Sequence, residues 1–485
     1  MPSQAKKISI DTAAIFVARI ASLLLGLVRL KYIAIYLGVE TFGIYTFAVY
    51  FVAMFSIFFD VGLGQILTRD ISADKERTSK YVSSALYLKI ILFVATAGII
   101  SAATFVSHFN AITNWAVAFS IFITGTTSLS TVFTGAFQAH RKMRLLSVIT
   151  VATDFSTSVA VIALLILGYG LFGLMIGSAA VTLIMFLATL YLARRSIKAV
   201  IGAPSIHLWK YLFKEGYPVA IGALGITLYM YVTSALLKYI SGNVAAGYYN
   251  AAFKIISILT VIPVSFDLVI YPFFAELFVS EREKLRSVLN SSIRYMLIIS
   301  IPMAVGTILI ADKLIATLYT KEFLPSVPAL QLLILSSMIS YANYVLYTFL
   351  PAINEQRFGM YVTIPTGVAV AVVNYLMIGR FGLLVPASSL VAVEIILFAA
   401  AYFYLGKLGY RLSLSRLFVK PFLACLPMAA LLVVTRNTSI LFQIPAAALV
   451  YALSFYFMKG ILKEDKEILE KILPTPIRGK VLKYI

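Results

Sequence analysis

Apolar stretches of near-uniform length, separated by short polar or glycine-containing turns, recur along the whole chain. A helix needs ~20 predominantly apolar residues to cross the hydrocarbon core of a bilayer. Fourteen stretches approach or exceed that length, so the pattern predicts an all-α, polytopic membrane protein. The expected spans are residues 11–37, 43–66, 82–107, 115–138, 145–167, 174–193, 218–240, 247–270, 287–310, 327–350, 359–378, 384–405, 417–434 and 440–458.

Composition strengthens this prediction. Hydrophobic residues make up 61% of the chain and charged residues 12%, whereas a soluble protein has about half and a quarter. The formal net charge is +20, but membrane proteins gather Lys and Arg in cytoplasmic loops, so we expect no nucleic-acid partner. One cysteine, Cys425, and three scattered histidines predict neither an internal disulfide nor a metal centre.

The distribution of positive charge predicts the orientation. With a cytoplasmic N-terminus, the inner segments hold 28 of the forty Lys and Arg residues and the outer loops hold 4, the remaining 8 lying inside spans. Such a bias is typical of the cytoplasmic side. We therefore expect a multi-pass protein of the cell membrane with both termini in the cytoplasm.

Two inner segments have amphipathic character. The first covers residues 194–217 and the second is the tail, residues 459–485. Both are expected to lie in the membrane interface, with their basic residues near anionic head groups. A partner-docking helix is the alternative interpretation of the tail.

The chain also contains an internal repeat. The tetrapeptide LKYI begins at Leu30 and again at Leu237, and the same separation of 207 residues relates Asp60 to Asp267. A G-x-Y motif follows in each copy, at Gly43–Tyr45 and Gly247–Tyr249. Six spans per copy predict parallel repeats. The expected parts are a six-helix lobe (1–193), an amphipathic linker (194–217), a second six-helix lobe (218–405), two extra helices (406–458) and a cytoplasmic tail (459–485).

Several segments resemble a known family. They are YLGVETFGIYTFAVYFVAMFSIFFDVGLGQILTRDIS from Tyr36, GYYNAAFKI from Gly247, PALQLLILSSMISYANYVLYTFLPAINEQRFGMY from Pro328 and NYLMIGRFGLLVPASSLVAVEI from Asn374. Over residues 8–405 the chain is similar to the polysaccharide-transporter, or Wzx-like O-antigen flippase, family of the multidrug/oligosaccharidyl-lipid/polysaccharide (MOP) exporter superfamily. The resemblance implies two lobes around a cavity that opens alternately to each side, and transport of a polyprenyl-linked glycan to the outer leaflet for surface polysaccharide assembly.

Cations inside the spans are the candidates for substrate binding. Arg19 lies eight residues beyond the start of the first span, about 12 Å deep, and Lys254 lies about 10 Å deep. Charges at such depth need a cavity or a partner. Together with Arg29 they are expected to line a cationic cavity that compensates the phosphate or diphosphate of the substrate. An ion pair between Arg19 and Asp60 is the structural alternative.

The acidic side chains suggest a second role. Asp154 and Glu394 lie deep in their spans and are the candidates for binding a coupling ion, H⁺ or Na⁺. Asp60 and Asp267 are expected to be structural groups near helix ends, and Arg294 to be a structural or gating charge. No cofactor and no catalytic residue is predicted.

Two rival functions would require features that this sequence does not favour. A multidrug cation antiporter of the same superfamily would need acidic pockets, whereas cations outnumber anions two to one inside these spans. A membrane enzyme of polysaccharide synthesis would need a large outer loop or a D-x-D site. No Walker A motif is present, so the chain is not expected to hydrolyse ATP. A polysaccharide polymerase or glycosyltransferases are the expected protein partners.

Overall fold

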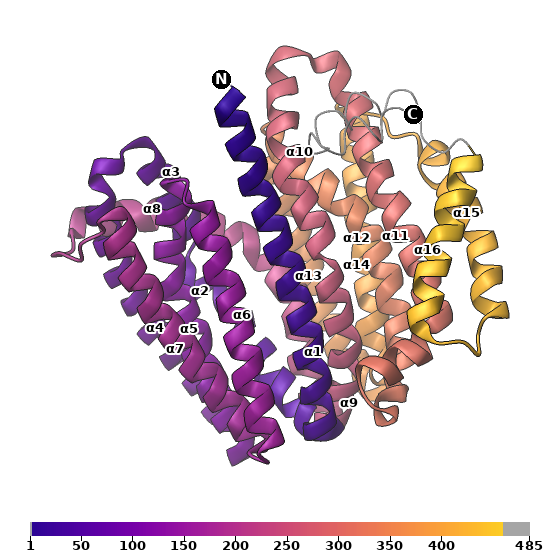
Figure 1. The fold of residues 1–485 in the computed structure, drawn as a ribbon, viewed down its shortest axis with the longest axis horizontal. Coiled ribbons are helices and arrows are strands. Elements are labelled where there is room, and N and C mark those ends of the chain that lie inside the picture. The colour runs from indigo at the N-terminus through magenta and orange to yellow at the C-terminus, as the bar shows by residue number, and fades with distance from the viewer. Residues whose placement is uncertain (1, 459–485) are drawn as a thin grey trace. The chain divides into compact units, whose positions relative to one another are not determined.

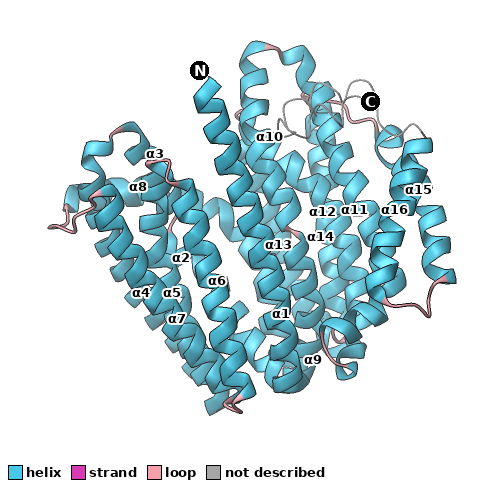
Figure 2. Ribbon diagram, viewed as in Figure 1, coloured by secondary structure: helices cyan, strands magenta, loops and turns pink. Residues whose placement is uncertain are grey.

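The structure is a computed structural model that describes the backbone of residues 2–458. It describes their side chains except at positions 2–20, 218, 219, 221–223, 226, 228, 268 and 414–416. The described residues form helices joined by short loops, and none of them forms a strand (Figure 2). The expected cytoplasmic tail, residues 459–485, lies outside the described residues.

The chain packs into two compact units, Met1–Gly247 and Tyr248–Ile485. Figure 1 follows the helices from indigo at the N-terminus to yellow at the C-terminus. Unit 1 contains α1 (Pro2–Met54), α2 (Ser56–Asp60), α3 (Leu63–Ala73), η1 (Lys75–Arg77), α4 (Thr78–Val106), α5 (Ala111–Ala139), α6 (Met143–Ile166), α7 (Gly170–Ile197), α8 (Ile206–Thr227), the π-helical turn η2 (Leu228–Val232) and the first half of α9 (Thr233–Leu259). Unit 2 contains the rest of α9, α10 (Val261–Ser280), α11 (Arg282–Leu318), η3 (Lys321–Ser326), α12 (Val327–Ala352), α13 (Gln356–Phe381), α14 (Leu384–Lys407), α15 (Leu414–Val434) and α16 (Ile440–Phe457).

The expected division at residues 194–217 differs from this packing. That segment forms the end of α7, a loop and the start of α8, and α8 packs against α2, α3 and α4. The segment is therefore part of unit 1 rather than a separate linker. The boundary falls after Gly247 because the first half of α9 also packs within unit 1.

Twelve stretches of the described chain are long and apolar enough to cross a membrane. Two of them, Ala21–Met54 and Tyr229–Ser280, are interrupted by glycines in a left-handed conformation, Gly38 with φ 65° and Gly242 with φ 84°. Only glycine adopts this backbone without strain, and each interruption separates two of the expected spans. The predicted all-α, fourteen-span membrane architecture is thereby confirmed.

The repeated G-x-Y glycines lie against each other within unit 1. A Cβ atom on Gly43 would lie 2.0 Å from the carbonyl oxygen of Asn243, and one on Gly247 would lie 2.5 Å from that of Val39. Both distances are far below van der Waals contact, so the two turns meet backbone to backbone. The glycines of the sequence motif therefore allow two repeat-related segments to cross.

Two of the expected spans differ from the helices that the structure shows: the second is broken and the eighth ends later in the chain than expected. The second breaks after Asp60, where Val61 (φ 47°) and Gly62 (φ 72°) turn the chain before α3 begins. Non-helical backbone at membrane depth is tolerated where it lines a cavity or is buried in protein. The eighth span continues as α10 to Ser280, beyond its expected end at residue 270.

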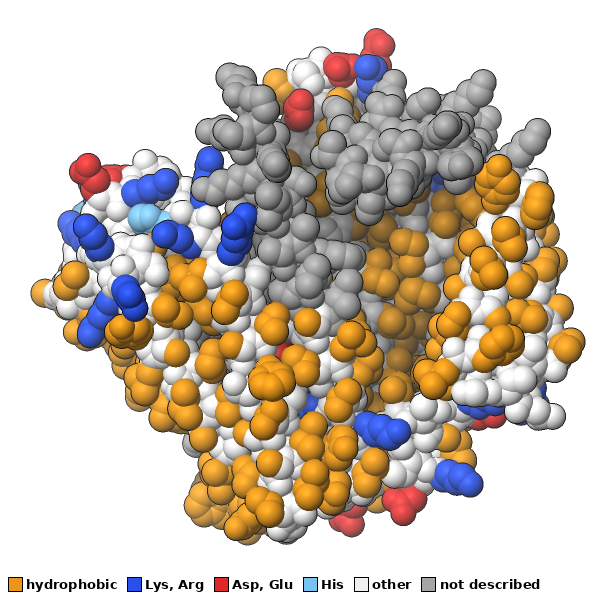
Figure 3. Space-filling model, in the orientation of Figure 1, with side chains coloured by type: hydrophobic (Ala, Val, Ile, Leu, Met, Phe, Trp, Pro, Cys, Tyr) orange, Lys and Arg blue, Asp and Glu red, His pale blue; other side chains and the backbone are white. Residues whose placement is uncertain are grey.

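Apolar side chains fill the core of unit 1 and also cover its outside. Leu67 of α3, Val82 of α4 and Phe133 of α5 are fully buried together. On the outer surface Val94 is 66% and Phe105 is 80% exposed. Figure 3 shows hydrophobic side chains spread over the flanks of the visible face, which is the surface expected of a protein whose solvent is lipid.

Candidate functional site

A recess of 810 Å³ opens in unit 1 between the broken α2–α3 segment and α5. Among the described lining residues, nine of fifteen carry a hydroxyl or amide group and Asp60 is the one that is charged, while apolar atoms make up most of the exposed wall. The lining residues are Ser56, Ile57, Phe59, Asp60, Gly64, Gln65, Thr68, Ile123, Thr124, Thr127, Ser128, Thr131, Thr134, Gly135 and Gln138.

The helical repeat explains why these residues share one wall. On α5 the polar residues recur every three or four positions, from Thr124 through Thr131 to Gln138, which places them on one face. The α3 helix lies close by, because a Cβ atom on Gly135 would be 3.3 Å from the Gly64 carbonyl oxygen. The sequence analysis did not identify this polar face. Its signal is the recurrence of Ser, Thr and Gln every three or four residues in GTTSLSTVFTGAFQ from Gly125.

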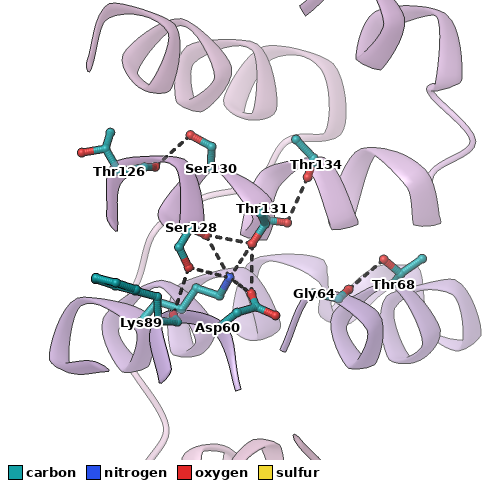
Figure 4. A network of polar contacts seen from close by, with 10 residues as sticks. Asp60, Gly64, Thr68, Lys89, Thr126, Ser128, Ser130, Thr131 and Thr134 are labelled. Atoms are coloured by element: carbon teal, nitrogen blue, oxygen red, sulfur yellow. Dashed lines mark hydrogen bonds and ion pairs between the residues drawn. The ribbon is translucent and has the colours of Figure 1, made fainter. Parts of the chain in front are cut away.

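Asp60 forms an ion pair with Lys89 of α4 (Figure 4). The Lys89 side chain is fully buried, whereas that of Asp60 is 35% exposed to the recess. The same Lys89 ammonium donates to the hydroxyl of Thr131 and, at 2.9 Å, to the carbonyl oxygen of Ser128. Thr131 also donates to Asp60, so the pair is held within a network that joins α2, α4 and α5.

This network decides the electrostatics of the recess. A buried charge is tolerated when it is paired and hydrogen-bonded, and here Lys89 compensates the charge of Asp60. The wall then presents hydroxyl and amide groups without a net charge of its own. Such a wall can donate to and accept from an uncharged polar ligand, but it offers no excess negative charge to a cation.

The position of Asp60 agrees in part with the sequence analysis. It is the last residue of α2 and so does end a helix, but the helix breaks inside the second expected span. Its ion-pair partner among the described side chains is Lys89. Arg19, the partner weighed from the sequence, has its side chain outside those that the structure describes. Lys89 lies within the third expected span, residues 82–107, and the sequence alone does not show which helix supplies its partner.

The other two candidates for the cationic cavity belong to different units. Arg29 is half-buried on α1 in unit 1, and Lys254 is half-buried on α9 in unit 2. Each unit has its own packing, and a cavity shared by Arg19, Arg29 and Lys254 stays a prediction. Asp154, one of the two coupling-ion candidates, is half-buried on α6 in unit 1.

Glu394 lies in the core of unit 2. Its side chain is 5% exposed on α14, and its carboxylate accepts a hydrogen bond of 2.7 Å from the side-chain amide of Asn343 on α12. The same amide donates to the backbone carbonyl of Glu394 at 2.9 Å. The structure therefore gives this carboxylate a fixed, largely dehydrated position between two helices.

Asp267 does not end a helix, and the expectation that it does is wrong. It lies inside α10, which continues to Ser280. Arg294 of α11 is nearly buried, at 6% exposed. The separation from Lys89 to Arg294 is 205 residues, close to the 207 that relate Asp60 to Asp267. Each unit thus carries a repeat-related aspartate, Asp60 or Asp267, and a buried cation, Lys89 or Arg294, a little under thirty residues later in the chain.

A second recess in unit 1 is apolar. It measures 680 Å³ and lies between α1 and α6. Leu24 and Val28 of α1 and Phe155 and Val159 of α6 line it. Ser158 is the polar residue among the described residues that line this recess. Arg29 follows Val28 directly in the chain.

Comparison with known proteins relates the chain to one sequence family and to one membrane protein of similar sequence. The sequence pattern of the polysaccharide biosynthesis protein family matches residues 10–278. The uncharacterized membrane protein MJ1068 of Methanocaldococcus jannaschii is 27% identical over 199 residues, which are 41% of this chain and 39% of that protein. The chain's match therefore spans about two fifths of the length of this relative.

Solved structures share the fold. The lipid II flippase MurJ in an inward closed conformation has a TM-score of 0.72 at 16% identity, covering 93% of this chain and 98% of that one. An inward-facing multidrug resistance MATE family transporter of the MOP superfamily has a TM-score of 0.64 at 15% identity, covering 83% and 98%. A MOP superfamily transporter from Pyrococcus furiosus, with a binding pocket of reverse polarity, has a TM-score of 0.59 at 16% identity, covering 82% and 96%.

Identities this low relate the folds and leave the substrates open. The family match is of a different kind, because it covers more than half of the chain. It also includes the α2–α5 segment that builds the polar recess. This protein belongs to the polysaccharide biosynthesis protein family and has the fold of the MOP-superfamily transporters.

Proposed function

We propose that this protein is a flippase that moves a polyprenyl-(di)phosphate-linked oligosaccharide from the cytoplasmic to the outer leaflet by alternating access. The observation that carries the proposal is the hydroxyl-lined recess of unit 1, where Lys89 compensates Asp60, the one charged residue among the described residues that line it. A sugar is uncharged and rich in hydroxyl groups. The recess offers it donors and acceptors without attracting a cation.

The charge of the recess also separates this function from its main rival. A multidrug antiporter must bind cationic drugs. A carboxylate whose charge is not compensated by the protein would attract such a cation. Here the Asp60 carboxylate is engaged by the Lys89 ammonium and the Thr131 hydroxyl. Uncharged polar ligands are therefore favoured over cationic drugs, although MATE transporters share the fold.

The charged and lipid parts of the substrate need their own contacts. Arg29, Lys254 and Arg19 are proposed to compensate the phosphate groups, with arginine supplying a planar fork of donors. The apolar recess between α1 and α6 has the character needed for part of a polyprenyl chain. The lipid II flippase with the same fold is named for a lipid-linked substrate, which supports the same substrate class here.

Energy coupling is proposed to use an ion gradient. Glu394 is the better placed candidate, since it is nearly buried and its carboxylate has an amide neighbour. A buried carboxylate can bind H⁺ or Na⁺ and thereby favour one conformation over another. Asp154 is the second candidate. We further propose cytoplasmic termini, location in the cell membrane, and cooperation with a polymerase or glycosyltransferases.

Deletion of the encoding gene tests this function in the cell. The proposal expects loss of surface glycan together with accumulation of a lipid-linked precursor that membrane-impermeant periodate cannot reach in intact cells. Complementation with the wild-type protein should restore both. Unchanged surface glycan combined with increased sensitivity to cationic drugs would contradict the proposal and favour the antiporter.

A further inference from the structure

Helix α8 lies flush against unit 1 along one of its faces. Leu212 is fully buried in the core of unit 1. A Cβ atom on Gly216 would lie 2.2 Å from the carbonyl oxygen of Val61, in the turn between α2 and α3. This close approach leaves no gap between the helix and that turn. One face of α8 is therefore fixed by packing, and the opposite face points away from the rest of unit 1.

Polar contacts with α3 fix the rotation of α8 about its own axis. The Arg69 guanidinium of α3 donates to Glu215 at 3.1 and 3.2 Å, to Tyr211 at 2.9 Å and to Asp70 at 2.8 Å. Hydrogen bonding to Asp70 and then to Glu215 raises the pKa of Arg69 above its ordinary value. These contacts hold the Tyr211 and Glu215 side of α8 against α3.

The beginning of α8 is anchored on α4. The Trp209 indole donates at 2.8 Å to the carbonyl oxygen of Ser84. The preceding loop is bound by serine hydroxyls on the same helix, which accept from the backbone amides of residues 200, 202 and 205. Trp209 is therefore held at the level of the first turns of α4, where the apolar part of that span begins.

The outward face of α8 combines two lysines with two aromatic rings. Lys210, Phe213, Lys214 and Tyr217 follow at helical spacing, and with Trp209 and Leu88 they line a recess of 480 Å³. Phe213 is 48% and Tyr217 is 47% exposed. Neither lysine has an ion-pair partner among the described residues. Like charges four positions apart on a helix repel each other, so an anion between them would relieve that repulsion.

This end of unit 1 carries further positive charge. In Figure 3, Lys and Arg side chains gather over the end of unit 1 where α3 and α8 lie, above a flank of hydrophobic side chains. Polar heads and apolar tails of lipids meet at such a boundary, and tryptophan and tyrosine favour it. The recess is lined by two cations and by apolar side chains, which are the groups that a phospholipid's charged head and apolar tails require.

We propose that this recess binds the head group of one anionic phospholipid, with its phosphate between Lys210 and Lys214. The upper part of an acyl chain then lies against Trp209, Phe213 and Leu88. The attraction of each lysine for an anionic lipid surface adds to that of the other. We expect a local preference for anionic over zwitterionic lipid of about thirtyfold.

Trp209 provides the measurement, because the chain has two tryptophans, Trp115 and Trp209. The full-length Trp115→Phe protein is reconstituted into vesicles containing phosphatidylglycerol or phosphatidylcholine brominated near the glycerol end of one chain. Bromine quenches indole fluorescence at short range. At equal mole fraction, brominated phosphatidylglycerol should quench Trp209 more strongly than brominated phosphatidylcholine.

Charge variants show whether the lysines cause the preference. Lys210→Gln/Lys214→Gln should make the two lipids quench equally, whereas Lys210→Arg/Lys214→Arg should retain the preference. Lys407→Gln/Arg411→Gln in unit 2 removes the same charge and should retain it as well. Equal quenching by both lipids in the parent protein, or an unchanged preference after Lys210→Gln/Lys214→Gln, would overturn the proposal. Each variant's helix content and melting temperature verify that it is folded.

Discussion

At the scale of single residues, the ion pair of Asp60 with Lys89 sets the charge of the polar recess. Lys89 is buried and Asp60 faces the recess, and the pair with its hydrogen bonds joins α2, α4 and α5. In unit 2, the Glu394 carboxylate is instead held by the side-chain amide of Asn343.

Removing Lys89 should harm the protein more than removing the whole ion pair. Lys89→Gln leaves Asp60 without its compensating charge, and we expect a loss of about 1 to 3 kcal/mol of stability, below the ~3–5 kcal/mol typical of a fully buried pair. The double variant Asp60→Asn/Lys89→Gln should recover part of that loss. Thermal unfolding of the purified proteins measures this, with Lys80→Gln on the same helix as control. Additive effects of the two single substitutions would contradict the network.

Glu394 and Asp154 can be separated as coupling residues. Glu394→Gln and Asp154→Asn remove the charge that would bind H⁺ or Na⁺ while keeping the size of each side chain. Substitution of the responsible residue should abolish dependence of transport on the ion gradient and leave downhill exchange measurable. The assay is transport of lipid-linked glycan in vesicles with and without an imposed gradient. If both variants respond to the gradient like the wild type, neither carboxylate is the coupling site.

At the scale of helices, existence and order were predictable, whereas breaks were not. Span positions follow from apolar length, which is a local property of the sequence. The break at Val61 and Gly62 and the π-helical turn Leu228–Val232 depend on packing against other segments. The polar face of α5 could have been recognised, because Thr127, Thr131 and Thr134 recur at helical spacing within an otherwise apolar span.

The crossing of Gly43 and Gly247 should not tolerate a methyl group. Gly43→Ala or Gly247→Ala places a Cβ atom within 2.0 or 2.5 Å of a backbone oxygen, so the two turns must separate. Overpacking of this kind typically destabilises by about 1 to 3 kcal/mol. The matched control is Gly26→Ala on α1, where nothing lies within 4 Å of the added atom. Melting temperatures should fall for the first two variants only, and an equal response of all three would refute the close crossing.

At the scale of the whole molecule, the repeat and the charge distribution predict an even number of spans with both termini inside. Single cysteines at Ser3, Ser241 and Lys480, in a Cys425→Ser background, test this orientation. Membrane-impermeant maleimide should label the cysteine at position 241 in intact cells, and the other two only after permeabilisation. Labelling of positions 3 and 480 from opposite sides would contradict the even span count and the parallel repeat.

Movement of lipid-linked glycan by the purified protein can be measured directly in one reconstitution. Lipid-linked precursor isolated from deletion cells is incorporated into vesicles with and without purified protein, and its exposure to membrane-impermeant periodate is followed over time. We expect oxidation to stop at the outer-leaflet fraction in empty vesicles and to proceed to near completion with the wild-type protein. If oxidation stops at the same fraction in vesicles with and without the wild-type protein, and the reconstituted protein is folded, the protein does not move lipid-linked glycan.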